Sequence, residues 1–132
     1  QADANDPIAH MLLALALVES ESQPEAALEA AQRAVDLGGP SADLLDALGR
    51  AQLHAGDPET AEATFRRAIG VDSSLPSPRV SLAEALAAQQ RDRDAARVLR
   101  DSLVRRDTEK HTLLAERVRR LRDNAPRQSR FD

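Results

Sequence analysis

Residues 42–75, with the sequence ADLLDALGRAQLHAGDPETAEATFRRAIGVDSSL, determine the fold. Apolar and small residues recur at helical spacing on both sides of Gly56-Asp57-Pro58. Glycine permits the left-handed backbone that ends one helix, aspartate caps the next helix, and proline suits its first turn. The stretch therefore predicts two antiparallel helices joined by a short turn.

The same pattern occurs three times in the chain, at a period of 34 residues. A shift by this period aligns residues 8–41 and 76–109 with the central stretch without a gap, and it superposes Ala27, Ala61 and Ala95. A single helical hairpin leaves one apolar face bare, so consecutive hairpins are expected to stack on one another. The repeat predicts three stacked hairpins.

The end of the chain departs from the repeat. Residues 108–124 are predicted to form a seventh helix, with leucine and valine on one side and charged residues on the other. Such a helix closes a stack by presenting a polar outer face to water. Residues 125–132 are predicted to be a polar tail, so residues 1–132 are expected to form a single domain.

Composition argues against several classes of function. The chain has no cysteine, which excludes disulfides and thiolate metal sites. Its longest apolar stretch, residues 8–18, is shorter than the roughly 20 residues of a membrane-spanning helix, so a soluble protein of unassigned compartment is expected. Histidines 10, 54 and 111 lie in different predicted helices, and no phosphate-binding loop or metal-ligand spacing occurs. We therefore expect neither catalysis nor a cofactor or metal.

Charge is distributed unevenly along the chain. The net charge is -4, but residues 1–75 carry -9 and residues 76–132 carry +5. Acidic residues are interspersed among the arginines of the second half, and tyrosine and tryptophan are absent, so nucleic-acid binding is not expected. The opposite signs favour head-to-tail association, or docking of the basic end on an acidic protein surface.

Small and apolar residues stand at fixed places within the central stretch. Its first predicted helix has Leu45-x-x-Leu48-Gly49, and its second has Ala61-x-x-x-Phe65-x-x-Ala68. With Gly56-Asp57-Pro58 between them, these motifs resemble the tetratricopeptide repeat family. The resemblance covers residues 8–109. It implies an all-α, right-handed solenoid of three helical hairpins plus a C-terminal capping helix, which makes seven helices.

The resemblance also implies a concave groove, lined by the first helix of each repeat, that binds a peptide segment or a partner's surface. The positions of the family's carboxylate clamp hold no cationic residue here, so binding of a C-terminal carboxylate is not expected. Asp43, Asp46 and Glu84 favour a partner segment with basic residues among apolar ones, unless these acids only solvate the groove. The residues carried over to the groove are Leu12, Asp43, Asp46, Arg50, Leu53, His54, Ser77, Val80, Ser81 and Glu84.

The first predicted helix is apolar nearly all the way round, which is typical of a buried helix. An upstream repeat of a longer parent protein, a second copy of this chain, or the bound partner would each cover it. The chain begins at Gln1, as a processed terminus or a fragment would. Self-association is therefore the alternative function, and a longer solenoid attached to an enzyme stays open. The residues available for self-association are Ile8, Met11, Leu12, Leu13 and Leu15.

Overall fold

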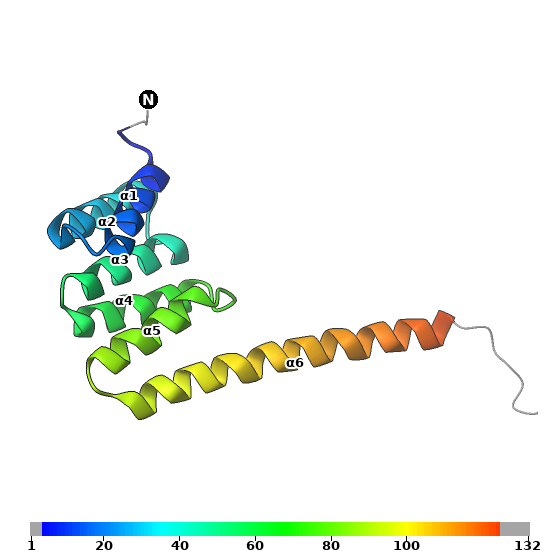
Figure 1. The fold of residues 1–132 in the computed structure, drawn as a ribbon. Coiled ribbons are helices and arrows are strands. Elements are labelled where there is room, and N and C mark those ends of the chain that lie inside the picture. Colours follow the sequence, from blue (N-terminus) through cyan, green and yellow to red (C-terminus); the bar gives the residue numbers. More distant parts are fainter. Residues whose placement is uncertain (1–3, 125–132) are drawn as a thin grey trace, which may run out of the picture. The chain divides into compact units, whose positions relative to one another are not determined.

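The computed structural model describes the backbone of residues 4–124 and the side chains of residues 4–105 and 112–123. The described residues form six helices and no strand, which confirms the predicted all-α fold of helical hairpins (Figure 1). The predicted tail, residues 125–132, lies outside the described residues. The helices are α1 (Pro7–Glu19), α2 (Pro24–Gly38), α3 (Ala42–His54), α4 (Pro58–Val71), α5 (Ser77–Ala88) and α6 (Asp92–Asn124).

The structure differs from the prediction at the end of the chain. The second helix of the third hairpin and the expected capping helix over residues 108–124 are one continuous helix, α6, of 33 residues. No glycine or proline occurs between Asp92 and Asn124, so no residue there favours ending the helix. Six helices are therefore present in the described residues where seven were expected.

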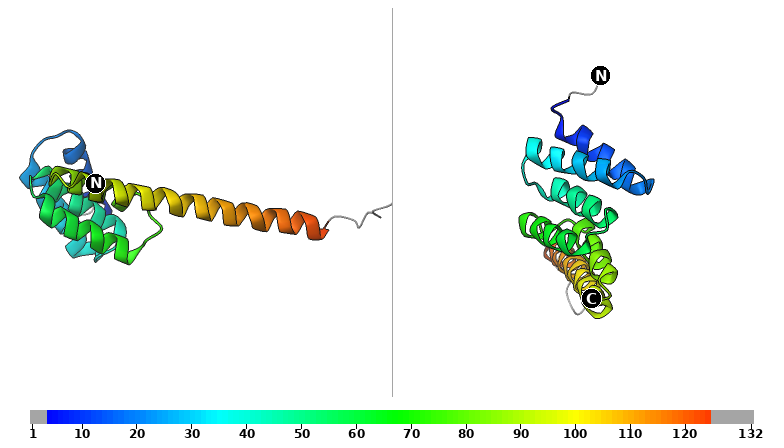
Figure 2. Two further views of the ribbon diagram at one scale, coloured as in Figure 1. Left: turned by 90° about the horizontal axis from the view of Figure 1, so that it is seen from below. Right: turned by 90° about the vertical axis from the view of Figure 1, so that its left-hand side faces the viewer.

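The chain divides into two compact units, Gln1–Leu99 and Arg100–Asp132. The single domain expected from the sequence stays a prediction. Within the first unit, α1 packs on α2 and α3 on α4 as hairpins, and α2 packs on α3 and α4 on α5. These helices follow one another in a single stack (Figure 2). The first helices of the hairpins also meet, because α3 contacts both α1 and α5. This contact places residues of α1, α3 and α5 beside one another.

Side chains at the starts of α1, α3 and α4 cap these helices. Asp6 accepts a hydrogen bond from the Ile8 amide at 2.9 Å, and Ser41 accepts one from Leu44 at 3.3 Å. Asp57 accepts one from the Thr60 amide at 3.3 Å, as the central turn predicts. Each cap satisfies an amide that has no partner within its helix, which fixes the helix boundary.

The core of the first unit consists of two clusters dominated by alanine. Alanine permits close approach of helices because its side chain ends at Cβ. One cluster joins α1, α2 and α3 through Ala14, Ala27, Ala30, Ala31, Leu48 and Ala51. The other joins α4, α5 and the start of α6 through Ala61, Phe65, Leu82, Ala83, Ala85, Leu86 and Ala95.

A polar clamp joins α4 to the turn between α5 and α6. Gln89 Nε2 donates a hydrogen bond to Glu62 Oε1 at 2.9 Å, and Arg91 Nη1 forms an ion pair with the same oxygen at 2.7 Å. The hydrogen bond from Gln89 is the largest effect on the pKa of Glu62, which lies below its usual value, and Arg66 and Arg91 lower this pKa further. Glu62 is therefore a fixed anion at neutral pH that holds this turn to α4.

The contact between Gly49 and Phe65 predicts opposite effects for two glycine-to-alanine substitutions. Alanine at position 49 would place its Cβ 2.6 Å from Phe65 Cδ1, and that ring is fully buried. We expect Gly49→Ala to lower the free energy of unfolding by about 2 kcal/mol through overpacking. The helical propensity gained by removing glycine, about 1 kcal/mol, is too small to offset this loss.

The matched control is Gly70→Ala in α4, where the new Cβ would have no described atom within 4 Å apart from its chain neighbours and the backbone of its own helix. Only the propensity gain remains there, so stability should rise by about 0.5 kcal/mol. Urea unfolding followed by circular dichroism measures both changes. Equal stabilisation of the two variants would show that Gly49 is not needed for the packing of Phe65.

Candidate functional site

A hollow of about 320 Å³ lies in the first unit, where α1, α3 and α5 meet. On α3, the contributing residues are three and four positions apart and so lie on one helix face. On α5, the contributing residues have the same spacing and share one helix face, which borders the same hollow. The residues that line the hollow are Val18, Glu21, Arg50, Leu53, His54, Val80, Ser81 and Glu84.

Six of the ten predicted groove residues line the hollow. They are Arg50, Leu53 and His54 on α3 and Val80, Ser81 and Glu84 on α5. Val18 and Glu21 also line it, although the sequence does not predict them as groove residues. Val18 follows Leu17 in a helix with apolar residues on every side, so periodicity gave no sign of its direction. Glu21 lies in the turn after α1 with a positive φ of 53°, and no helical pattern extends to it.

Three of the eight residues that line the hollow are apolar. Val18 and Leu53 are half-buried, while Val80 is 46% exposed. An exposed valine on the edge of a hollow offers apolar area that a ligand's side chain can cover. The hollow therefore has an apolar surface available for binding.

Two carboxylates at the hollow give it a negative charge. Glu21 and Glu84 are exposed, and neither forms an ion pair within the described part of the chain. The cation of the hollow, Arg50, is already paired with Asp46. The unbalanced charge of this site is therefore anionic.

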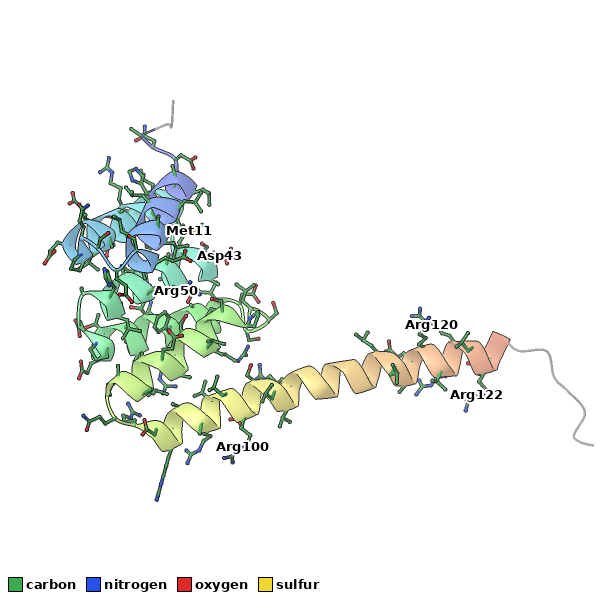
Figure 3. All side chains as sticks on the ribbon, viewed as in Figure 1. Met11, Asp43, Arg50, Arg100, Arg120 and Arg122 are labelled. Carbon is green, nitrogen blue, oxygen red and sulfur yellow. The ribbon has the colours of Figure 1, made fainter. Side chains whose placement is uncertain are left out.

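Arg50 belongs to a network that joins α3 to α5. Its Nε lies 3.4 Å from Asp46 Oδ2 and donates a hydrogen bond to Ser81 Oγ at 3.3 Å. Ser77 Oγ accepts a hydrogen bond from Arg50 Nη2 and donates one to Asp46 Oδ2 at 2.7 Å. Figure 3 labels Arg50 on α3. The network fixes the guanidinium and with it one side of the hollow.

Asp46 lies behind the hollow rather than on its surface. The residue is only 9% exposed, its Oδ2 is shared between Arg50 and Ser77, and its Oδ1 is buried with no hydrogen-bond partner. The sequence predicts that Asp46 is among the acids that meet a basic partner, but its contacts in the structure are internal. Direct pairing of Asp46 with a partner stays a prediction, and the geometry gives it a supporting position.

The other predicted residues lie around the hollow. His54 lines it and bonds through Nε2 to the carbonyl oxygen of Ser22 at 3.0 Å, which ties α3 to the turn after α1. Leu12 and Asp43 are exposed on α1 and α3 and do not line the hollow. Ser77 contributes to the Arg50 network instead of lining the hollow.

The residues predicted for self-association show mixed exposure. Ile8, Leu12 and Leu13 are 49%, 57% and 51% exposed, whereas Met11 and Leu15 are half-buried. The first helix is thus buried on one face, through Ala14, and bears three large apolar side chains on its exposed part. This exposed part is a second apolar surface of the first unit.

The described residues hold no group of three or more histidine, aspartate or glutamate side chains arranged to bind a metal ion. No helix in the described part of the chain combines the length and apolarity needed to cross a membrane. The fold and the hollow together define a helical repeat protein whose first helices share one surface.

A family model described as tetratricopeptide repeat matches residues 1–43, 22–76 and 47–110. The chain therefore belongs to the tetratricopeptide repeat family, which confirms the resemblance seen in residues 8–109. Repeats of this family generally mediate protein–protein interaction and form a non-catalytic fold. A comparison with curated proteins found no match.

The buried position of Asp46 gives a prediction that separates it from Asp43, three residues earlier on the same helix. Asp46→Lys would place a second cation beside Arg50 in a buried site, so the free energy of unfolding should fall by about 3 kcal/mol or more. Asp43→Lys changes the charge equally at an exposed position, and should cost about 0.5 kcal/mol through the helix dipole. Thermal and urea unfolding measure both, and equal stability of the two variants would contradict the supporting role of Asp46.

Proposed function

We propose that the chain binds a peptide segment of another protein in the hollow between α1, α3 and α5, and that this segment carries a basic residue next to apolar ones. One observation carries the proposal. The hollow combines two exposed carboxylates, Glu21 and Glu84, which form no ion pair among the described side chains, with the exposed side chain of Val80.

The chemistry of the hollow supports this class of partner. A lysine or arginine of the segment would form charge-assisted hydrogen bonds with the carboxylates of Glu21 and Glu84. Apolar side chains beside it would cover Val18, Leu53 and Val80, with a gain of about 25 cal/mol for each Å² removed from water. An acidic segment would meet repulsion instead, so charge sets the specificity and apolar contact supplies the affinity.

The network behind the hollow supports binding in a different way. Arg50 is held by Asp46, Ser77 and Ser81 before any partner arrives. A wall that is already ordered loses little side-chain entropy on binding, which favours affinity. In this proposal, Leu12 and Asp43 contact the flanking parts of the segment, and Asp46 and Ser77 keep Arg50 in place.

Charge reversal in the hollow tests the proposal. Peptides selected from a random library displayed on phage should be enriched in lysine or arginine flanked by apolar residues. Calorimetry should show that Glu21→Lys with Glu84→Lys weakens binding of the selected peptide about tenfold or more, because two attractions become repulsions. The matched control, Glu29→Lys with Glu59→Lys, changes the same charge at exposed positions outside the hollow and should leave the affinity unchanged.

Equal affinity of the wild-type chain and the Glu21, Glu84 double variant would contradict this assignment. Enrichment of acidic peptides in the selection would also overturn it. Circular dichroism of each variant verifies that the helices remain intact, which is expected because both glutamates are exposed.

Self-association is the second function we propose, and the exposed apolar part of α1 favours it. Ile8, Leu12 and Leu13 together offer a surface that a second copy would cover. Leu12→Glu should reduce the solution mass, measured by light scattering over a tenfold concentration range, from an oligomer to a monomer. A wild-type chain that is monomeric throughout this range, or an oligomer that survives the substitution, would rule out this surface.

A further inference from the structure

A separate apolar surface occurs near the end of α6, in the second unit. Leu113, Leu114, Val118 and Leu121 are between 60% and 65% exposed. All four belong to α6 and lie in residues 112–123, a part of the helix whose side chains are described. So many exposed large apolar side chains on one helix indicate a surface that another molecule covers.

The spacing of these residues shows which kind of molecule fits. Leu114, Val118 and Leu121 are separated by four and three residues, which places them on one face of the helix. In the heptad notation abcdefg they occupy positions d, a and d. Apolar residues at a and d form the narrow seam by which one helix packs along another.

Arginine residues border this seam on both sides. Arg117 occupies position g and Arg122 position e, the two positions that meet a partner helix beside the seam (Figure 3 labels Arg122). Glu116 and Asp123 both occupy position f, on the side away from the seam. Arg122 forms an ion pair with Asp123 at 3.6 Å, but both side chains are more than 60% exposed, so the pair is weak and water screens it. The seam therefore has cationic borders.

These borders argue against a second copy of the chain as the occupant. In a parallel pair, position g of one helix meets position e of the next heptad on the other, so Arg117 would face the second copy's Arg122. In an antiparallel pair, position g meets position g, so Arg117 would face the second copy's Arg117. Like charges across a helix pair are unfavourable in either orientation.

The seam is also a poor match for a lipid surface. Helices that lie on membranes present a broad apolar face, commonly with tryptophan or phenylalanine. Here arginine residues flank the a/d seam on both sides, so the apolar face is narrow. Residues 112–123 also contain no aromatic side chain. The pattern is that of a helix-pairing surface.

We propose that α6 docks an acidic amphipathic helix of a partner protein along the seam formed by Leu114, Val118 and Leu121. The partner helix carries apolar residues at its own a and d positions and glutamate or aspartate at e and g. Burial of the seam drives association, while pairing of Arg117 and Arg122 with these acids sets partner choice and orientation. This surface is separate from the hollow in the first unit.

The test uses the full chain and a designed probe peptide of about four heptads, with valine at a, leucine at d and glutamate at e and g. A second peptide differs only by lysine at e and g. Calorimetry at low salt should show that the chain binds the glutamate peptide at least tenfold more tightly than the lysine peptide. Arg117→Glu with Arg122→Glu should reverse this preference.

The matched control is Arg119→Glu with Arg120→Glu, which makes the same charge change at positions b and c, outside the seam. This control should keep the preference for the glutamate peptide. The hollow variant, Glu21→Lys with Glu84→Lys, should also keep it, which separates failure here from failure of the proposed hollow. Equal binding of both peptides, binding of neither, equal effects of the two arginine double variants, or binding to phosphatidylserine vesicles in place of the peptide would overturn the proposal.

Discussion

The contact between Gly49 of α3 and the buried ring of Phe65 in α4 is the constraint on which the first unit depends. Because position 49 has no side chain, the ring can occupy the space where a Cβ would stand. The two helices of the central hairpin then approach closely, and α3 takes its place between α1 and α5. Arg50, Leu53 and His54, which follow Gly49 on α3, reach the hollow only because α3 is held in this position.

Charge within the first unit is arranged in two layers. Behind the hollow, Asp46 neutralises Arg50, and Ser77 and Ser81 of α5 form hydrogen bonds with this pair. At the surface, Glu21 and Glu84 are not balanced by any ion pair within the described residues. An internal pair of this kind orders a binding wall, and unpaired surface carboxylates give that wall its preference for cations. The structural and the recognition charges are thus different residues.

Local signals in the sequence were sufficient to predict the helical hairpins. Gly56-Asp57-Pro58 ends one helix and starts the next, and the 34-residue period repeats this arrangement, so the pairing of α1 with α2 and of α3 with α4 followed from pattern alone. The sequence predicts a break within α6 because the 34-residue period places the end of the third repeat at residue 109. The residues themselves, which include no glycine or proline from Asp92 to Asn124, contain no stop signal.

The site was predicted less completely because its decisive contacts join residues far apart in the chain. Asp46 is buried by contact with Ser77, 31 residues later, and helical periodicity on α3 does not report such a neighbour. Glu21 enters the hollow from a turn with left-handed backbone, to which no repeat pattern applies. Alignment of the first helices of the three repeats therefore predicts most of the residues that line the hollow. It does not show which groove residues are buried supports and which are exposed.

The most direct test of the central claim is an NMR titration of the isotope-labelled chain with a peptide selected for binding. Backbone amide chemical shifts should change most at Leu53, Val80 and Glu84. The chemical shift of the backbone amide of Arg67, an exposed residue on α4, should stay constant. Saturable changes confined to the hollow are the predicted result. A peptide that binds with equal affinity while shifting only residues of α2, α4 or α6 would contradict the account.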